Sequence, residues 1–290
     1  MIEIAIASGK GGTGKTFLAS NLLYYMYTHG IPAAGLDADV EEPDLAISLG
    51  GRARCLEEFV CKGARVARID YSKCIACRTC VDVCRYRAIR IENSRPVVDE
   101  DECSGCGLCE ILCPSKAIDM VETELGNIRR VITGSGIEIV EAELIRGGSS
   151  GKLVYEAKTY ARTVYRDRKA LVVDVAAGIG CPVISAIAGA DLLVVVVEPM
   201  PQSMQGAERL IEMARAMSIR CVAVVNRFDL YGSKPREIAD VEVIGYIPFD
   251  PRVVESYYRM KPILAYAPTS SASRALIEVI EHIIEIAKIR

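Results

Sequence analysis

The chain has 290 residues, of which 51% are hydrophobic and 25% are charged, and its formal net charge is -3. This length suits one large α/β domain with a small insert, and the composition is typical of a globular protein. The low net charge gives no support for binding to nucleic acid or to an acidic membrane surface. No apolar run approaches the ~20 residues that span a bilayer. We therefore expect a cytoplasmic protein with no nucleic-acid partner and no membrane insertion.

The first forty residues predict the beginning of a parallel sheet. Residues 2–7 are an apolar run typical of a buried strand, and a glycine-rich segment follows at 9–16. Residues 15–28 predict a helix, and residues 33–37 predict a second strand. A strand, loop, helix and strand in this order form a right-handed crossover unit.

The glycine-rich segment matches the phosphate-binding motif G-x4-G-K-[ST]. Gly9, Gly14, Lys15 and Thr16 satisfy the motif after a strand and at the start of a helix, which is the context that the motif requires. Backbone N–H groups and the helix N-terminus attract phosphate oxygens. We expect Lys15 to contact the β- and γ-phosphates of a nucleotide and Thr16 to ligate Mg²⁺. The other loop residues expected at the nucleotide are Lys10, Gly11, Gly12 and Thr13.

Eight of the twelve cysteines lie in two runs with identical spacing, C-x2-C-x2-C-x3-C. The runs are Cys74, Cys77, Cys80, Cys84 and Cys103, Cys106, Cys109, Cys113. Disulfides are disfavoured because cytosolic thiols stay reduced. Structural zinc is disfavoured because its sites use two separated C-x2-C pairs. The spacing resembles that of bacterial ferredoxins, which hold two 4Fe–4S clusters.

The ferredoxin resemblance implies how the eight cysteines are shared. In two-cluster ferredoxins, the fourth cysteine of each run ligates the other cluster. This implies one cluster on Cys74, Cys77, Cys80 and Cys113, and a second on Cys103, Cys106, Cys109 and Cys84. Arg85 follows Cys84 where ferredoxins usually carry proline, and a cation there would raise the potential of the nearby cluster.

The pattern of the chain changes at the cysteine runs and then returns to α/β. We predict an insert over 65–120 between two parts of one ATPase domain, 1–64 and 121–290. Residues 122–145 predict a hairpin or extended rim, and 147–152 predict a loop before a helix that ends near Tyr165. The remaining predicted strands are 171–174, 192–198, 220–226 and 241–246, and the remaining predicted helices are 203–217 and 271–288. The expected fold class is a mostly parallel P-loop NTPase sheet with an inserted, ferredoxin-like α+β domain.

The run from Lys10 to Thr16 resembles the deviant Walker A loop of the MinD/Mrp ATPases, which include the nitrogenase iron protein. In that family the early lysine crosses a dimer interface to the partner's nucleotide. The resemblance therefore implies a homodimer that binds two ATP molecules, with Lys10 and Lys15 both in catalytic roles.

Further segments resemble the switches and the base pocket of the same family. Residues 37–44 resemble switch I, where Asp39 is the preferred residue to orient the attacking water and the Mg²⁺ shell, with Asp37 second. Residues 174–178 resemble switch II, which implies that Asp174 holds Mg²⁺ through water and that Gly178 senses the γ-phosphate. Relatives usually carry paired prolines at the positions of Ala176 and Ala177. The residues that resemble the adenine pocket are Asn226, Arg227 and Pro248.

Four cysteines lie outside the runs. Cys221 begins a predicted buried strand and is expected in the core. Cys181 lies just after the switch II segment, where the nitrogenase iron protein carries a cluster ligand. It is either a ligand or a thiol with a packing or reactive role. Cys55 and Cys61 have no assigned role.

These features favour an ATPase whose nucleotide cycle controls electron transfer through two 4Fe–4S clusters to an unidentified redox partner. Two alternatives stay open. One is an ATPase that assembles or carries Fe–S clusters for an acceptor protein. The other is a MinD-like positioning ATPase.

Overall fold

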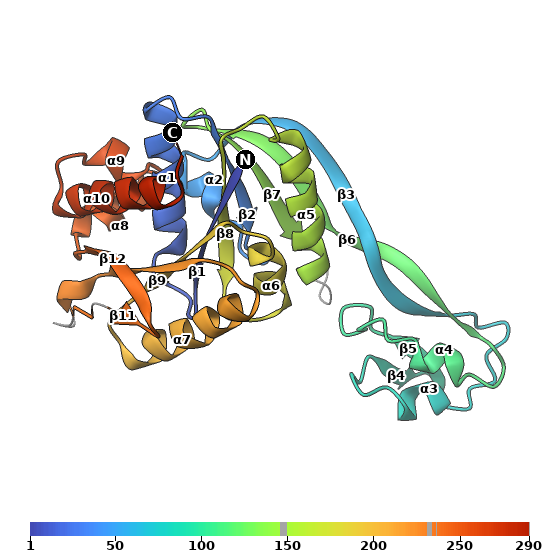
Figure 1. The fold of residues 1–290 in the computed structure, drawn as a ribbon. Coiled ribbons are helices and arrows are strands. Elements are labelled where there is room, and N and C mark those ends of the chain that lie inside the picture. Colours follow the sequence, from blue (N-terminus) through green and yellow to red (C-terminus); the bar gives the residue numbers. More distant parts are fainter. Residues whose placement is uncertain (146–149, 231–233, 236, 290) are drawn as a thin grey trace.

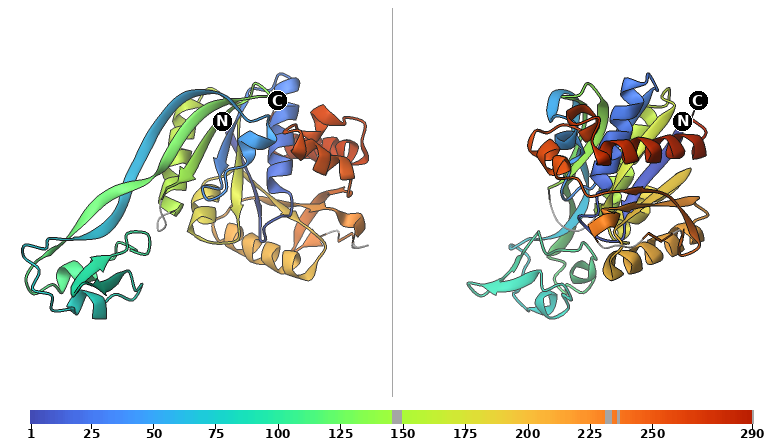
Figure 2. Two further views of the ribbon diagram at one scale, coloured as in Figure 1. Left: turned by 180° about the vertical axis from the view of Figure 1, so that it is seen from behind. Right: turned by 90° about the vertical axis from the view of Figure 1, so that its left-hand side faces the viewer.

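The computed structural model describes residues 1–145, 150–230, 234–235 and 237–289. A large sheet with helices on both faces forms the body of the molecule (Figure 1). A long two-stranded arm leaves one edge of this body and carries a small cysteine-rich unit at its far end. Two further views show the same separation between body and tip (Figure 2). The fold is therefore α/β with a mostly parallel sheet, as the sequence predicts.

The sheet has the strand order β11-β12-β10-β9-β1-β8-β2-β7-β6-β3. The parallel strands are β1 (Ile2–Ser8), β2 (Ala33–Ala38), β7 (Glu138–Leu144), β8 (Ala170–Ala177), β9 (Leu192–Val197), β10 (Cys221–Asn226) and β12 (Val241–Ile247). The antiparallel strands at the two edges are β3 (Arg52–Ile69), β6 (Ile118–Thr133) and β11 (Glu237–Ile238). The central strands are almost wholly apolar because helices cover both faces of the sheet.

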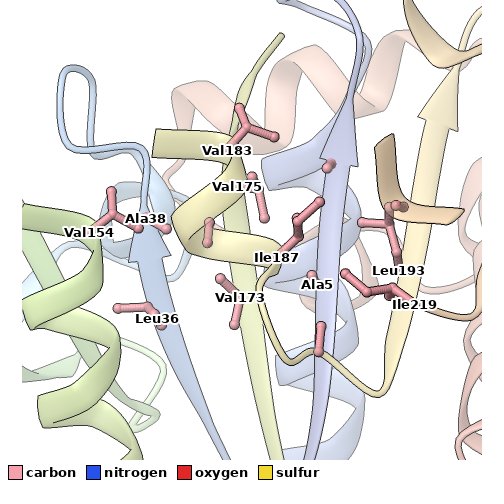
Figure 3. Close-up of a cluster of buried hydrophobic side chains, with 14 of the residues drawn as sticks. Ala5, Leu36, Ala38, Val154, Val173, Val175, Val183, Ile187, Leu193 and Ile219 are labelled. Carbon is pink, nitrogen blue, oxygen red and sulfur yellow. The ribbon is translucent and has the colours of Figure 1, made fainter. Parts of the chain in front are cut away.

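Helices bury one apolar core on each face of the sheet. The first core receives side chains from α5 (Ser150–Val164), α6 (Cys181–Ile187) and α7 (Pro201–Ala216). Figure 3 shows Val154 of α5 and Ile187 of α6 above the strands, among Ala5 of β1 and the alternate residues Leu36 and Ala38 of β2 and Val173 and Val175 of β8. The second core receives side chains from α1 (Lys15–Thr28), α2 (Leu45–Ser48), α9 (Ile263–Tyr266) and α10 (Ser271–Ile286). None of the described helices is long and apolar enough to cross a membrane.

The arm is longer than the predicted insert. Strands β3 and β6 pair in antiparallel register from Arg52↔Thr133 to Ile69↔Ile118. The predicted limits of the insert, Arg65 and Met120, therefore lie inside these strands and not in linkers. The reason is that much of the ribbon is exposed on both sides, so β3 lacks the apolar alternation that marks a half-buried strand.

The tip contains α3 (Thr79–Asp82), the hairpin of β4 (Ile89–Glu92) and β5 (Arg95–Val98), and α4 (Leu108–Ile111). Its two halves repeat the same backbone geometry with the 29-residue period of the sequence. The Asp70 amide donates to the Ala117 carbonyl at 2.7 Å, and the Asp99 amide donates to the Ala88 carbonyl at 2.7 Å. Arg78 and Gly107 occupy equivalent left-handed positions before α3 and α4.

Most predicted elements are present within one or two residues of their predicted bounds. The predicted rim at 122–145 is the β6–β7 hairpin. The predicted loop at 147–152 lies partly outside the described residues, and α5 begins at Ser150. The sequence did not predict several short elements, among them α2, α6, α9, α8 (Pro251–Tyr258) and the 3₁₀ turn η1 (Phe228–Leu230).

Candidate functional site

The phosphate-binding loop joins β1 to α1 and presents its lysine at the start of the helix. Gly12 and Gly14 have φ values of 78° and 102°, which L-residues with a side chain rarely adopt. A Cβ at Gly14 would also overlap the Asn226 amide. Lys15 is only 8% exposed, and Lys10 is exposed. The loop therefore holds Lys15 in place and leaves Lys10 free to reach outward.

The first glycine of the motif has a packing role. A Cβ at Gly9 would overlap the backbone of Gly206 in α7. A cavity lies next to the loop and is described below. Gly9 does not line it, and neither do Lys10 or the buried Thr13. Gly9 therefore lets α7 approach the loop, while Gly11, Gly12, Gly14, Lys15 and Thr16 face the cavity.

A cavity of about 490 Å³ lies at the carboxyl ends of the central strands. Its polar side contains loop residues and the carboxyl groups of Asp39, Glu42 and Asp44. Its other side is more apolar and contains Phe17, Pro248, Phe249, Val253, Val254 and Tyr257. The sequence pointed to this side only through the segment that begins at Pro248, and it gave no role to Phe17, Val253, Val254 or Tyr257. The Asp250-Pro251 step was the available signal, because Asp at the N-cap and Pro at the first position begin a helix, and Asp250 caps α8 in the structure.

Asn226 and Arg227 line the cavity and also hold the phosphate loop. The Asn226 Nδ2 donates to the Thr13 carbonyl at 2.8 Å. The Arg227 guanidinium donates to the Gly12 carbonyl and pairs with Glu198 at 3.0 Å. Asn226 was expected in the adenine pocket, and here its side-chain amide donates one hydrogen bond to the backbone of the loop.

Asp37 in β2 and Asp39 directly after it have different environments. Asp39 lines the cavity. Asp37 is fully buried, and its carboxylate accepts from the Asp39 amide at 3.1 Å and the Leu45 amide at 2.9 Å. Asp37 therefore fixes the course of the segment that follows β2, and Asp39 is the residue that can face a ligand.

Asp174 is a buried carboxyl group with an unsatisfied oxygen. It lies beside Asp37 in the register of β8 and β2, and its Oδ1 has no hydrogen-bond partner. Burial raises the pKa of Asp174 to about 7, while a hydrogen bond with Thr16 and the charge of Lys15 oppose this rise. A buried, unpaired carboxylate oxygen next to a threonine hydroxyl fits a Mg²⁺ shell.

The switch II segment follows Asp174 and returns to the phosphate loop. The Gly178 amide donates to the Ser8 carbonyl at 2.9 Å, and Gly178 has a φ of 101°. Ala177 lines the cavity, and Gly178 does not. This segment is thus tied to the end of β1 next to the loop.

The eight clustered cysteines form two groups at the tip. One small cavity is lined by Cys74, Cys77, Cys80 and Cys113, and another is lined by Cys84, Cys103, Cys106 and Cys109. No three His, Cys, Asp or Glu side chains among the described residues converge on a single metal ion. Cysteines that do not converge on one point are compatible with a cluster, because each thiolate of a 4Fe–4S site binds a different iron atom. Each cavity thus carries the four soft ligands that such a cluster needs.

The other cysteines are dispersed over the body and the arm. Cys181 is exposed at the first position of α6, and Cys221 is half-buried at the start of β10. Cys61 is buried in the arm and Cys55 is exposed there. These four residues do not line the two cysteine cavities.

A match to the CobQ/CobB/MinD/ParA nucleotide binding domain covers residues 4–263. The chain belongs to this family. The expectation of a MinD/ParA-type, nucleotide-binding P-loop protein is therefore confirmed at the family level.

Relatives of this family cover almost the whole chain. An uncharacterized protein of Methanocaldococcus jannaschii is 31% identical over 271 residues, which are 92% of this chain and 93% of that protein. An uncharacterized ATP-binding protein of the same organism is 28% identical over 296 residues, with 98% of each chain covered. The septum site-determining protein MinD of Pyrococcus horikoshii, solved in complex with Mg-ADP, has a TM-score of 0.62 at 17% identity and covers 99% of this chain and 97% of its own. This last likeness shows the MinD-type fold.

One local match belongs to a redox enzyme. The archaeal-type glutamate synthase [NADPH] of Thermotoga maritima is 49% identical over 55 residues, which are 18% of this chain and 11% of that enzyme. A match this short says nothing about the activity of the whole chain.

Proposed function

We propose that this protein is an ATP-hydrolysing switch that controls electron transfer through two 4Fe–4S clusters at the tip of its arm. The proposal rests on one observation. Two sets of four cysteines line separate cavities, and each set combines three cysteines of one run with the last cysteine of the other. This sharing is the arrangement of a two-cluster ferredoxin. The local likeness to glutamate synthase and the ATP-binding relative support the two halves of the proposal.

In the nucleotide site, the residues have separate roles. Lys15 and the loop amides would bind the phosphates. Thr16 and Asp39 would hold Mg²⁺, and Asp174 would hold it through water. Asp39 lines the cavity, where it would orient the attacking water. The apolar side of the cavity, with Phe17, Pro248 and Tyr257, would receive the base.

At the tip, thiolates would hold the clusters, which when bound supply one-electron transfer. Cys80 and Cys109 are buried, and Cys77 and Cys106 are exposed. Thr79 lies within hydrogen-bond distance of the Cys77 sulfur, and the pKa of Cys77 is lowered by its hydrogen bonds with Thr79. The exposed ligands Cys77 and Cys106 would mark the side of each site that faces a partner protein.

The arm is joined to the switch I segment at its root. Arg52, the first residue of β3, pairs with Glu141 at 2.5 Å, and Glu141 is fully buried beside Asp37 in the register of β7 and β2. Asp37 in turn holds the backbone of Asp39 and Leu45. A change in this segment on ATP binding would therefore act on the base of the arm.

We also propose that the active unit is a homodimer, with an unidentified redox protein as acceptor. The exposure of Lys10 supports the crossing role that the resemblance implies. In a dimer closed on ATP, Lys10 would contact the partner's nucleotide.

The test is a redox titration of anaerobically purified protein with and without a non-hydrolysable ATP analogue. We expect about eight irons per chain by the ferredoxin spacing, and a shift in midpoint potential or in the rate of electron release when the analogue binds. Two zinc ions per chain would refute the redox function. Eight irons with no response to nucleotide would refute the coupling alone.

A positioning function is the second candidate, because the structural likeness to a septum site-determining MinD covers nearly the whole chain. ATP-dependent sedimentation with anionic lipid vesicles would support it. An assembly or carrier function would instead require transfer of the clusters to an apo-ferredoxin faster than the protein turns over.

A further inference from the structure

Helix α5 lies between the switch II end of the body and the root of the arm. At its first turn, a Cβ on Gly151 would lie 3.0 Å from the Cβ of Cys181, which begins α6 directly after the switch II segment. Further along α5, Lys158 donates to the carbonyls of Ala186 and Ala188 at the end of α6. These contacts fasten α5 to both ends of α6, so the two helices form one rigid pair.

The opposite side of α5 contacts the arm at several points. A Cβ on Gly126 of β6 would overlap Leu153, and a Cβ on Gly63 of β3 would overlap the Lys152 side chain. The Tyr160 ring packs edge-on against Phe59 with 5.0 Å between centroids, and the Tyr160 hydroxyl donates to Glu57. The arm root therefore rests on α5 over more than two turns of the helix.

Two of the four register shifts between β3 and β6 occur at the point where the ribbon leaves the body, and the other two lie nearer the start of β3. Strand β6 pairs with β7 only as far as Gly126, and beyond that residue it pairs with β3 alone. Register shifts occur in β3 between Cys61 and Lys62 and between Lys62 and Ala64, and Gly63 has a φ of 128°. Bulges bend a strand pair and weaken its ladder, so this is where the arm can change direction.

We propose that α5 and α6 act as a lever that transmits the state of switch II to the arm. A shift of the segment 174–180 displaces the start of α6, the rigid pair carries the shift to Gly63, Gly126 and Phe59, and the arm turns at its bulges. This inference rests on the proposed ATP switch but not on the clusters. It adds a second link to the body, separate from the Arg52–Glu141 contact near switch I.

The test is hydrogen–deuterium exchange of the full chain with ADP and with a non-hydrolysable ATP analogue. In the native protein we expect the analogue to change the exchange of amides 55–63. Phe59→Ala and Tyr160→Phe should abolish most of this difference, because they weaken the contact between α5 and the arm. Tyr155→Phe is the matched control on the same helix, since Tyr155 is 60% exposed, and it should keep the full difference.

Coupling between two sites is reciprocal. The Phe59→Ala protein should therefore also change its preference for the analogue over ADP, by about 5-fold or more if the coupling has a typical size. The lever proposal would be refuted if amides 55–63 of the native protein exchanged at the same rate with ADP and with the analogue. A Phe59→Ala, Tyr160→Phe double variant that keeps the native difference and the native preference would also refute it. Iron analysis of the same samples tests the cluster proposal separately.

Discussion

The body and the tip of this molecule are held together by different physical means. The body buries two large apolar cores, one on each face of the sheet. Among the described residues, the apolar cluster at the tip is small: it consists of Ala67, Ile69, Cys80, Ile89, Cys109 and Ile118, and other cysteines of the runs pack around it. A unit with so little apolar burial needs another source of stability. The body can therefore fold by burial alone, whereas we expect the tip to fold around its clusters.

The largest expected effect is the collapse of the tip when its metal ligands are lost. Cys80→Ser combined with Cys109→Ser should remove the protection of amides 70–118 from exchange, because each cavity loses a buried ligand. The cooperative unfolding of the body, measured by calorimetry, should stay unchanged. Cys221→Ser is the control, since Cys221 lies outside both cysteine cavities. A tip that keeps its protection without metal would show that the small core suffices.

Loss of the loop lysine should affect the body site only. Lys15→Ala removes a buried ammonium that lines the cavity. We expect nucleotide affinity to fall by about 100-fold or more, in line with a lost charge-assisted contact of about 3 kcal/mol. Titration calorimetry measures the affinity, and iron content should not change. Lys10→Ala should instead retain nucleotide binding by the monomer and lose ATP-dependent dimerisation, which light scattering would detect. Native affinity in Lys15→Ala would refute the phosphate site.

Gly9 and Gly11 lie in the same loop, but only Gly9 packs closely against another element. Gly9→Ala should destabilise the body by about 2–3 kcal/mol, because the new methyl group overlaps the backbone of Gly206. Gly11→Ala should leave the free energy of unfolding within about 0.5 kcal/mol, since nothing lies within 4 Å of a Cβ there. Chemical denaturation measures both. Equal stability of the two variants would show that α7 can move away from the loop.

The smallest effect concerns the proton on Asp174. Its pKa is raised to about 7 by burial, so the folded protein binds a proton that the unfolded chain has lost above pH 4. The stability of the apoprotein should therefore fall as pH rises from about 4 to 7 and stay level above that. Asp174→Asn should reduce this slope and stabilise the apoprotein by about 1–3 kcal/mol near pH 8. Asp37 should retain part of the slope, because burial also raises the pKa of its carboxyl group.

The affinity for Mg-nucleotide should depend on pH in the opposite direction to the stability of the apoprotein. Mg²⁺ requires the ionised carboxylate, so the affinity for Mg-nucleotide should rise between pH 6 and pH 8. Isothermal titration at several pH values measures it. An affinity that does not change over this range would remove Asp174 from the metal shell.

Local spacing determined much of what could be learned from the sequence alone. The phosphate motif, the paired cysteine runs and the apolar strands are short patterns, because a loop that binds phosphate or a thiolate loop needs fixed residues at fixed intervals. The sequence therefore predicted the succession of most strands and helices along the chain, part of the loop face of the cavity and, through the ferredoxin resemblance, the two sets of cysteines. It also predicted that the chain returns to α/β after the cysteine runs.

Only the tertiary structure decided the features that depend on distant parts of the chain. Gly9 matches a motif, yet its neighbour is Gly206 in α7. Asp37 and Asp39 look alike in sequence, and burial assigns one to the backbone and the other to the cavity. The two-stranded arm was not predicted, and the predicted limits of the insert fall inside β3 and β6, because a ribbon exposed on both sides has no apolar period. The contact of α5 with both α6 and the arm joins residues far apart in the chain, and no local pattern encodes such packing.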